Sequence, residues 1–245
     1  MPVRFFILLL ALLALPSARA DVTGSVTLSG KPNSQDETFY ATAKGCGESP
    51  FRTTENWKVG TKGELADVVI WIVDPKPAAH PPSDAELKAA FPEIEIKQIG
   101  CKYIPHVVAV AANTNFAVIN GNPVLHNVRA KVNDGPGKPP GADVFNFGQS
   151  AQGARDEKQF EDPGLYTLQC DVHSWMQCWV KVLPHNYFAV SGADGAFKIS
   201  CVGLADGEYK IDAWHPRFIK TLEQTVEVKN GAATINFQFD GTKSF

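Results

Sequence analysis

Short apolar runs separated by turn residues restrict this chain to a mostly-β fold more strongly than any other feature. The run ADVVIWIVD, residues 66–74, has the length of a strand and is apolar throughout, which predicts a buried strand that ends at Pro75. One stretch is typical of a helix, DAELKAAF, and a capping box of Ser83 and Glu86 marks its start. Dipeptides that favour hairpin turns occur at Asp194-Gly195, Asp206-Gly207 and Asn230-Gly231. The sequence therefore predicts a mostly-β protein with one short helix.

The sequence pattern changes at Pro184 to short apolar runs joined by Asp-Gly and Asn-Gly turns, which divides the chain into two predicted domains. Residues 21–184 are expected to form a β-sandwich with an insertion at about 31–100 that carries the helix. The stretch 133–158 is rich in Gly, Pro and Asp, which predicts a long exposed loop with one ordered piece near 145–147. Residues 185–245 consist of short apolar runs joined by hairpin turns and predict a second, smaller β-sandwich.

The first twenty residues, 1–20, have the organisation of a secretory signal peptide. Arg4 supplies the positive region, residues 5–15 supply the apolar run, and ARA at 18–20 is a small-x-small cleavage site. An uncleaved anchor is the alternative, which the early Pro16 disfavours. We therefore expect an exported protein whose mature chain begins near residue 21.

Charge and hydropathy argue against nucleic acid and membrane partners. The formal net charge of -3 becomes -5 when the signal peptide is removed, because that segment contains two arginines and no acidic residue. Such mild acidity gives no reason to expect binding to nucleic acid or to an anionic membrane surface. No later segment approaches the roughly 20 apolar residues that a membrane span requires.

Sulfur and imidazole side chains are concentrated in the stretch CDVHSWM. It places Cys170, His173 and Met176 on a tight loop between two predicted strands, and upstream His126 begins a strand after a Gly-Asn-Pro turn. One thiolate and two imidazoles in a plane, with a weak axial thioether, are the ligands of a type 1 copper site. The thiolate favours Cu(I), the imidazoles accept both oxidation states, and the axial sulfur tunes the reduction potential. These four side chains are therefore predicted to hold one copper ion.

Each of these residues also has a plainer interpretation. Cys170 could be half of a disulfide, and His173 an ordinary loop histidine. His126 could be a satisfied histidine at a strand start, and Met176 could simply fill a gap in the core. For His106 a structural role is expected, with a second metal site as the alternative. Packing or surface roles are expected for the remaining histidines, which are His80, His185 and His215.

The wider pattern YIPHVVAV…NGNPVLHNVRA…PGLYTLQCDVHSWM resembles the cupredoxins over residues of about 101–183, with a ligand loop similar to that of amicyanin. Nearly the whole mature chain is similar to periplasmic methylamine-utilisation-like proteins, in which a cupredoxin domain precedes a carboxypeptidase-regulatory-like β-sandwich. The resemblance implies a Greek-key sandwich, a periplasmic location and the same four copper ligands. It also implies that Asn127 ties the two ligand loops together near the sulfur. Cupredoxins usually pass electrons through the loop histidine at an apolar patch, so a redox partner protein is expected to dock near His173 and Trp175. Simple burial is the alternative role for Trp175.

The odd number of cysteines supports a metal-bound thiolate. Five cysteines in an oxidising compartment leave at least one thiol unpaired, and metal binding protects such a thiol from oxidation. If Cys170 binds copper, the other four allow three pairings. Their positions favour Cys46 with Cys101, which would staple the insertion to the sandwich, and hence Cys178 with Cys201, between the domains.

Electron transfer by one copper ion that cycles between Cu(I) and Cu(II) is the function that these features predict. Enzyme activity is not expected, because the chain offers no second redox cofactor, no binuclear copper motif and no paired acid and base. One alternative is a non-redox copper-binding or carrier protein whose second domain docks a partner in the cell envelope. Another is an open-site copper enzyme, if Met176 is not a ligand and water or substrate takes its place. The pattern specifies neither the redox partners nor the oligomeric state.

Overall fold

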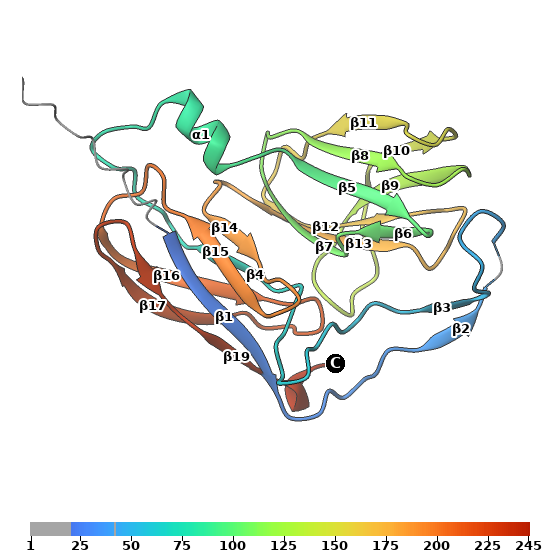
Figure 1. The fold of residues 1–245 in the computed structure, drawn as a ribbon, viewed down its shortest axis with the longest axis horizontal. Helices are drawn as coiled ribbons and strands as arrows, with labels where there is room; N and C mark the ends of the chain where they lie inside the picture. The colour runs from blue at the N-terminus through green and yellow to red at the C-terminus, as the bar shows by residue number, and fades with distance from the viewer. Residues whose placement is uncertain (1–20, 42) are drawn as a thin grey trace, which may run out of the picture.

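A computed structural model describes residues 21–41 and 43–245, which form two β-sandwiches, a separate two-stranded hairpin, one short α-helix and a 3-10 turn (Figure 1). The predicted mostly-β fold class is confirmed. The predicted signal peptide lies outside the described residues. Within these ranges no helix is both long and apolar enough to cross a membrane.

The first sandwich, called sandwich A, consists of a five-stranded sheet in the order β10-β9-β12-β13-β7 and a four-stranded sheet in the order β11-β8-β5-β6. The first sheet contains β7 (Val107–Ala111), β9 (His126–Val132), β10 (Asp143–Gln149), β12 (Gly164–Gln169) and β13 (Gln177–Leu183). The second contains β5 (Ile94–Ile99), β6 (Lys102–Ile104), β8 (Phe116–Asn120) and β11 (Arg155–Lys158). Facing side chains of both sheets, among them Tyr103, Phe116, Leu168 and Val180, form one buried core.

The second sandwich, called sandwich B, has a sheet in the order β14-β4-β16-β17 and a sheet in which β1 pairs with β15, β18 and β19. The first sheet contains β4 (Val69–Ile72), β14 (Phe188–Val190), β16 (Gly207–Trp214) and β17 (Leu222–Val228). The second contains β1 (Asp21–Ser29), β15 (Ala196–Ser200), β18 (Ala233–Thr234) and β19 (Phe237–Asp240), which a 3-10 turn (Gly241–Lys243) follows. Its core includes Val22, Ile70, Ile211 and Phe237.

Sheet pairing in sandwich B differs from the expected domain order along the chain. β1 and β4 fall within the expected first domain, 21–184, yet they pair with strands of 185–245. The predicted buried strand at 66–74 is β4, whose Ile70 and Ile72 face the core of sandwich B. Its Val69 packs instead with Val107 and Trp214 between the two sandwiches. Apolar runs predict that a strand is buried but not which sheet it joins, and this is why the order differs.

The segment 30–68 links the two sandwiches by an unexpected path. It leaves β1, forms a hairpin of β2 (Thr38–Tyr40) and β3 (Phe51–Thr53), and returns to sandwich B. In Figure 1 this hairpin lies at the right, far from β1. Residues 38–41 and 43–53 are called the cover hairpin below, because they lie over one end of sandwich A.

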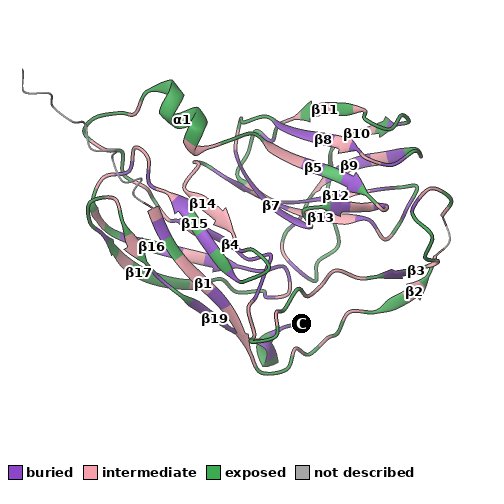
Figure 2. Cartoon of the chain, viewed as in Figure 1, coloured by how far each residue is buried: buried purple, intermediate pink, exposed green. Residues whose placement is uncertain are grey.

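Two local predictions have clear outcomes. The helix α1 (Asp84–Ala90) begins with the predicted capping box, since Ser83 and Glu86 bond to each other's backbone N–H groups. It buries none of its residues, and all but the last, Ala90, are exposed in Figure 2. The stretch 133–158 contains more structure than expected, because it includes two edge strands. β10 pairs with β9 in one sheet, and β11 pairs with β8 in the other.

Candidate metal centre

Three of the four predicted copper ligands meet at one end of sandwich A. The Sγ atom of Cys170 lies 3.9 Å from Nδ1 of His126 and 3.7 Å from Nδ1 of His173, and the two Nδ1 atoms are 3.1 Å apart. The centre of this triangle is about 2 Å from each atom, which is close to the length of a metal bond to sulfur or nitrogen. The three residues are 0%, 3% and 5% exposed in chain order. Soft sulfur with two imidazoles in a plane fits copper, so the donor set agrees with the predicted ion.

Strand pairing explains why residues 44 positions apart along the sequence come together. His126 is the first residue of β9 and Cys170 follows the last residue of β12. β9 and β12 are antiparallel neighbours, so the start of one lies beside the end of the other. His173 lies in the turn before β13, which is closed by the Met176 N–H donating to the His173 carbonyl at 2.9 Å.

Hydrogen bonding leaves Nδ1 of His126, the nitrogen that faces Cys170, free to bind a metal. Its Nε2 donates to Oδ1 of Asn122 at 3.1 Å, so Nδ1 keeps its lone pair. Burial, and next the neighbouring His173, lower the pKa of His126 to about 4. Burial and the Arg52 guanidinium also lower the pKa of His173. Both imidazoles are therefore neutral at pH 7, which is the form that binds metals.

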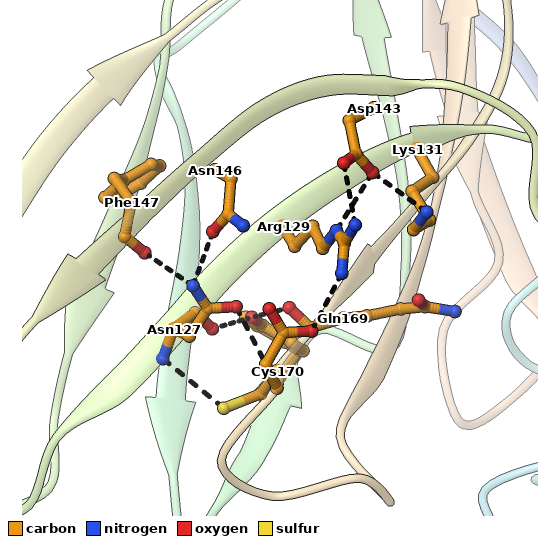
Figure 3. A network of polar contacts seen from close by, with 10 residues as sticks. Asn127, Arg129, Lys131, Asp143, Asn146, Phe147, Gln169 and Cys170 are labelled. Atoms are coloured by element: carbon orange, nitrogen blue, oxygen red, sulfur yellow. Dashed lines mark hydrogen bonds and ion pairs between the residues drawn. The ribbon is translucent and has the colours of Figure 1, made fainter.

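Asn127 has the contacts that the family resemblance implies (Figure 3). Its backbone N–H donates to Sγ of Cys170 at 3.3 Å, and its side-chain oxygen accepts from the Asp171 N–H at 3.2 Å. The amide nitrogen of Asn127 donates to the Phe147 carbonyl at 3.2 Å. The residue thus joins β9, β10 and the ligand loop beside the sulfur.

Ion pairs continue this network outward, as Figure 3 also shows. Arg129 binds Asp143 through two nitrogens at 2.9 and 2.7 Å and reaches Asp171 at 3.4 Å, while Lys131 contacts Asp143 at 2.8 Å. The Arg129 guanidinium, followed by Lys131, holds the pKa of Asp143 well below its usual range. These groups are partly exposed, so the pairs contribute little stability and chiefly orient the strands around the site.

Sequence reasoning missed two residues that support the ligands. Tyr103 is fully buried, and its hydroxyl lies within hydrogen-bond distance of the carbonyls of Asn127 and Gln169, each next to a predicted ligand in the chain. Asn122 holds His126 and also accepts the Cys101 N–H at 3.1 Å. A signal for Asn122 was present, because the Gly-Asn-Pro turn puts an amide four residues before His126.

The other predicted residues have mixed outcomes. Met176 is 2% exposed and packs in the same core as Cys170, so its location agrees with an axial role that stays a prediction. His106 is buried, and its Nδ1 lies 3.0 Å from the Gln177 carbonyl. Among the described residues, the groups of three candidate ligands do not include His106. His215 stacks on Trp57, and burial lowers its pKa to about 3.

One of the two predicted disulfides is present. Cys46 and Cys101 are bonded and join the cover hairpin loop to the turn between β5 and β6. The pairing of Cys178 with Cys201 is wrong, because both are free thiols and lie in the separate cores of sandwich A and sandwich B. Even parity of the four remaining cysteines suggested that pair, but parity carries no information about distance.

The loop histidine edge, expected to be exposed for a redox partner, is covered instead. Sγ of Cys46 lies 3.5 Å from Nε2 of His173. The Trp175 ring lies 5.3 Å from the His173 ring and its Nε1 donates to the Cys101 carbonyl at 3.0 Å. His173 is therefore buried under the disulfide that joins the segment 30–68 to the turn between β5 and β6.

Replacing Asn122 by alanine is expected to lower copper affinity by roughly 10- to 100-fold, the usual effect of losing a partner that orients a metal-bound histidine. The Nε2 proton of His126 would lose its acceptor, so the ring could adopt the tautomer in which Nδ1 is protonated. Competition with a chromophoric Cu(I) chelator measures the change. Asn122→Asp keeps an oxygen acceptor and should retain most of the affinity. Equal affinities for the alanine variant and the unsubstituted protein would contradict this role.

Comparison with known proteins gives partial matches. No family model matches the chain, and no curated protein matches it. A purple cupredoxin from Nitrosopumilus maritimus is 23% identical over 37% of this chain and 100% of its own, with a TM-score of 0.32. A variant of amicyanin in its Cu(I) state is 21% identical over 46% of this chain and 98% of its own, with a TM-score of 0.31. A copper-containing nitrite reductase from Thermus scotoductus is 19% identical over 45% of this chain and 25% of its own, with a TM-score of 0.29. More than half of this chain lies outside each overlap.

Proposed function

We propose that this protein transfers single electrons through one type 1 copper ion held by His126, Cys170, His173 and Met176. The observation that carries the proposal is the triangle of one Sγ and two Nδ1 atoms whose centre lies at bonding distance from each. A bound copper ion would supply the one-electron chemistry by alternating between Cu(I) and Cu(II).

The protein's own contribution is a rigid and dry ligand set. Asn122 fixes the tautomer of His126, and the Asn127 N–H bonds the thiolate sulfur. The Tyr103 hydroxyl contacts β9 beside His126 and the end of β12 beside Cys170. Because these contacts do not depend on the oxidation state, the ligands would keep one geometry in both states, which favours rapid electron exchange.

An exported electron carrier fits the remaining features better than an enzyme. The three ligands are almost fully buried, which leaves little access for a substrate. The predicted signal peptide and the Cys46–Cys101 disulfide both support an oxidising compartment such as the periplasm.

Titration of the mature protein with Cu(II) tests the proposal. One equivalent should produce an intense visible charge-transfer band that ascorbate bleaches and oxidant restores. Met176→Ala should shift the reduction potential and keep most of the band, as expected of a weak axial ligand. A colourless Cu(I) form that resists oxidation would instead support the carrier function, and binding without any visible band would contradict a type 1 site.

A further inference from the structure

The cover over His173 is built to stay closed. Cys46 is 3% exposed and Cys101 is 0% exposed, so a thiol reductant has little access to their disulfide. Arg52 is also buried in the cover hairpin, where it donates to the Cys46 carbonyl at 3.4 Å. A partner protein therefore cannot reach the Nε2 edge of His173 directly and must make contact elsewhere.

We propose that the outer face of the cover hairpin, formed by Tyr40 and Phe51, is the docking surface for a positively charged redox protein. The proposal rests on the electron-transfer function above. The sequence predicted a partner contact at His173 and Trp175. The proposed contact lies instead on the far side of the cover hairpin from these residues.

The two faces of the hairpin differ sharply. Cross-strand pairing places Phe39 opposite Arg52 and Tyr40 opposite Phe51, and successive residues of a strand point to opposite faces. On the inner face, the Phe39 ring lies 6.4 Å and the Arg52 guanidinium 5.7 Å from the Trp175 ring. On the outer face, Tyr40 and Phe51 are 69% and 57% exposed and pack edge to face at 5.9 Å.

Aromatic rings connect the metal centre to this outer face. The His173 ring contacts Trp175 at 5.3 Å, Trp175 contacts Phe39 at 6.4 Å, and Phe39 is bonded in the chain to Tyr40. Electron transfer between proteins slows steeply with distance. Transfer is therefore fastest to a partner that docks where this row of aromatic rings reaches the surface. Within the described residues, Tyr40 and Phe51 are the only exposed large aromatic side chains. Exposed aromatic pairs of this kind are typical of protein contacts.

Charge identifies the kind of partner. Glu37 and Glu48 are exposed and lie three residues before Tyr40 and Phe51, while Lys44 is the one exposed basic residue of the cover hairpin among those described. The mature chain carries a formal charge of -5, because the signal peptide contains two of the chain's 23 basic residues and no acid. A partner with a basic rim around an apolar patch would be attracted and oriented by this surface.

The test uses the copper-loaded mature protein and ferricytochrome c, a basic haem protein, as the probe. Stopped-flow mixing of the Cu(I) form with the probe gives a second-order rate constant. The double variant Tyr40→Ser with Phe51→Ser should lower that constant by about 10-fold or more, since central aromatic residues dominate protein contacts. Glu37→Gln with Glu48→Gln should lower it at low salt and flatten its dependence on ionic strength.

Matched variants separate docking from general effects. Leu125→Ser with Val172→Ser alters two residues, 48% and 51% exposed, that adjoin the ligand histidines in the chain, and should change the rate less than 2-fold, about the size of a near-neutral contact. Oxidation by a small cobalt(III) complex should be the same for every variant. A larger loss in the Leu125/Val172 variant, or an unchanged rate in the Tyr40/Phe51 variant with its visible band intact, would overturn the docking surface alone. Absence of the band in the unsubstituted protein would contradict the electron-transfer function and with it this surface.

Discussion

Replacing Cys170 by serine is expected to abolish the visible charge-transfer band completely. The band requires a thiolate bonded to Cu(II), and Sγ of Cys170 is the only sulfur at the corner of the donor triangle. A serine hydroxyl is a hard ligand and stays protonated at neutral pH. Loss of a residue that only orients a ligand lowers metal affinity by up to roughly 100-fold, so loss of the ligand itself should lower the affinity for Cu(I) by more than that. Absorption spectroscopy and competition with a Cu(I) chelator measure the two effects.

Cys178→Ser provides the matched control for this change. Cys178 is a buried thiol eight residues further along, and burial raises its pKa far above the usual value for a thiol. Its Sγ lies 3.5 Å from the Pro105 carbonyl, away from the donor triangle. The control should keep the full band. If Cys170→Ser kept the band and Cys178→Ser lost it, the ligand assignment would be wrong.

Removing the Cys46–Cys101 disulfide, by changing both residues to alanine, is expected to lower the free energy of unfolding by about 4 kcal/mol. The two cysteines are 55 positions apart, so the bond restricts a long loop of the unfolded chain. The cover hairpin otherwise contacts sandwich A through Phe39 and Arg52 at the Trp175 ring and through Ala43 at its core. Denaturant unfolding of the metal-free protein measures the loss. Lys44→Ala, an exposed change in the same loop, should stay within about 0.5 kcal/mol of the unsubstituted protein.

The same double variant should also uncover His173. Without the disulfide the hairpin can open locally at a lower free-energy cost, because its covalent link to sandwich A is gone. Carbethoxylation of the metal-free protein, followed by peptide mass analysis, should then modify His173 several-fold faster than in the parent chain. The fully buried His126, held by Asn122, serves as the internal reference. Equal rates at His173 with and without the disulfide would contradict the hairpin as its cover.

Local patterns predicted which side chains the structure brings together. The spacing of Cys170, His173 and Met176 places three candidate ligands on one tight turn, since residues this close along a chain stay close in any compact fold. His126 required one long-range pairing, between β9 and β12, but its position at a strand start indicated which end of the sheet it would occupy. The capping box at Ser83 was predicted for the same reason, because its hydrogen bonds reach only three residues.

Long-range features were predicted poorly. The disulfide between Cys178 and Cys201 was inferred from parity, and packing places the two thiols in separate cores. Strands β1 and β4 carry clear apolar patterns. The hydrophobic effect is non-directional and favours burial against any apolar surface, so these patterns do not show that the strands join sandwich B.

By itself, the sequence determined the mostly-β class, the candidate ligand residues and the loop that carries three of them, because these depend on residue chemistry and short spacings. Only the tertiary structure decided that segment 30–68 leaves one sandwich to cover the other. Many weak contacts between distant residues set that path, and the Cys46–Cys101 bond then holds it. The exposed edge expected at His173 was lost for this reason, and the surface through which this protein would meet a partner lies on a hairpin far from the ligand loop in sequence.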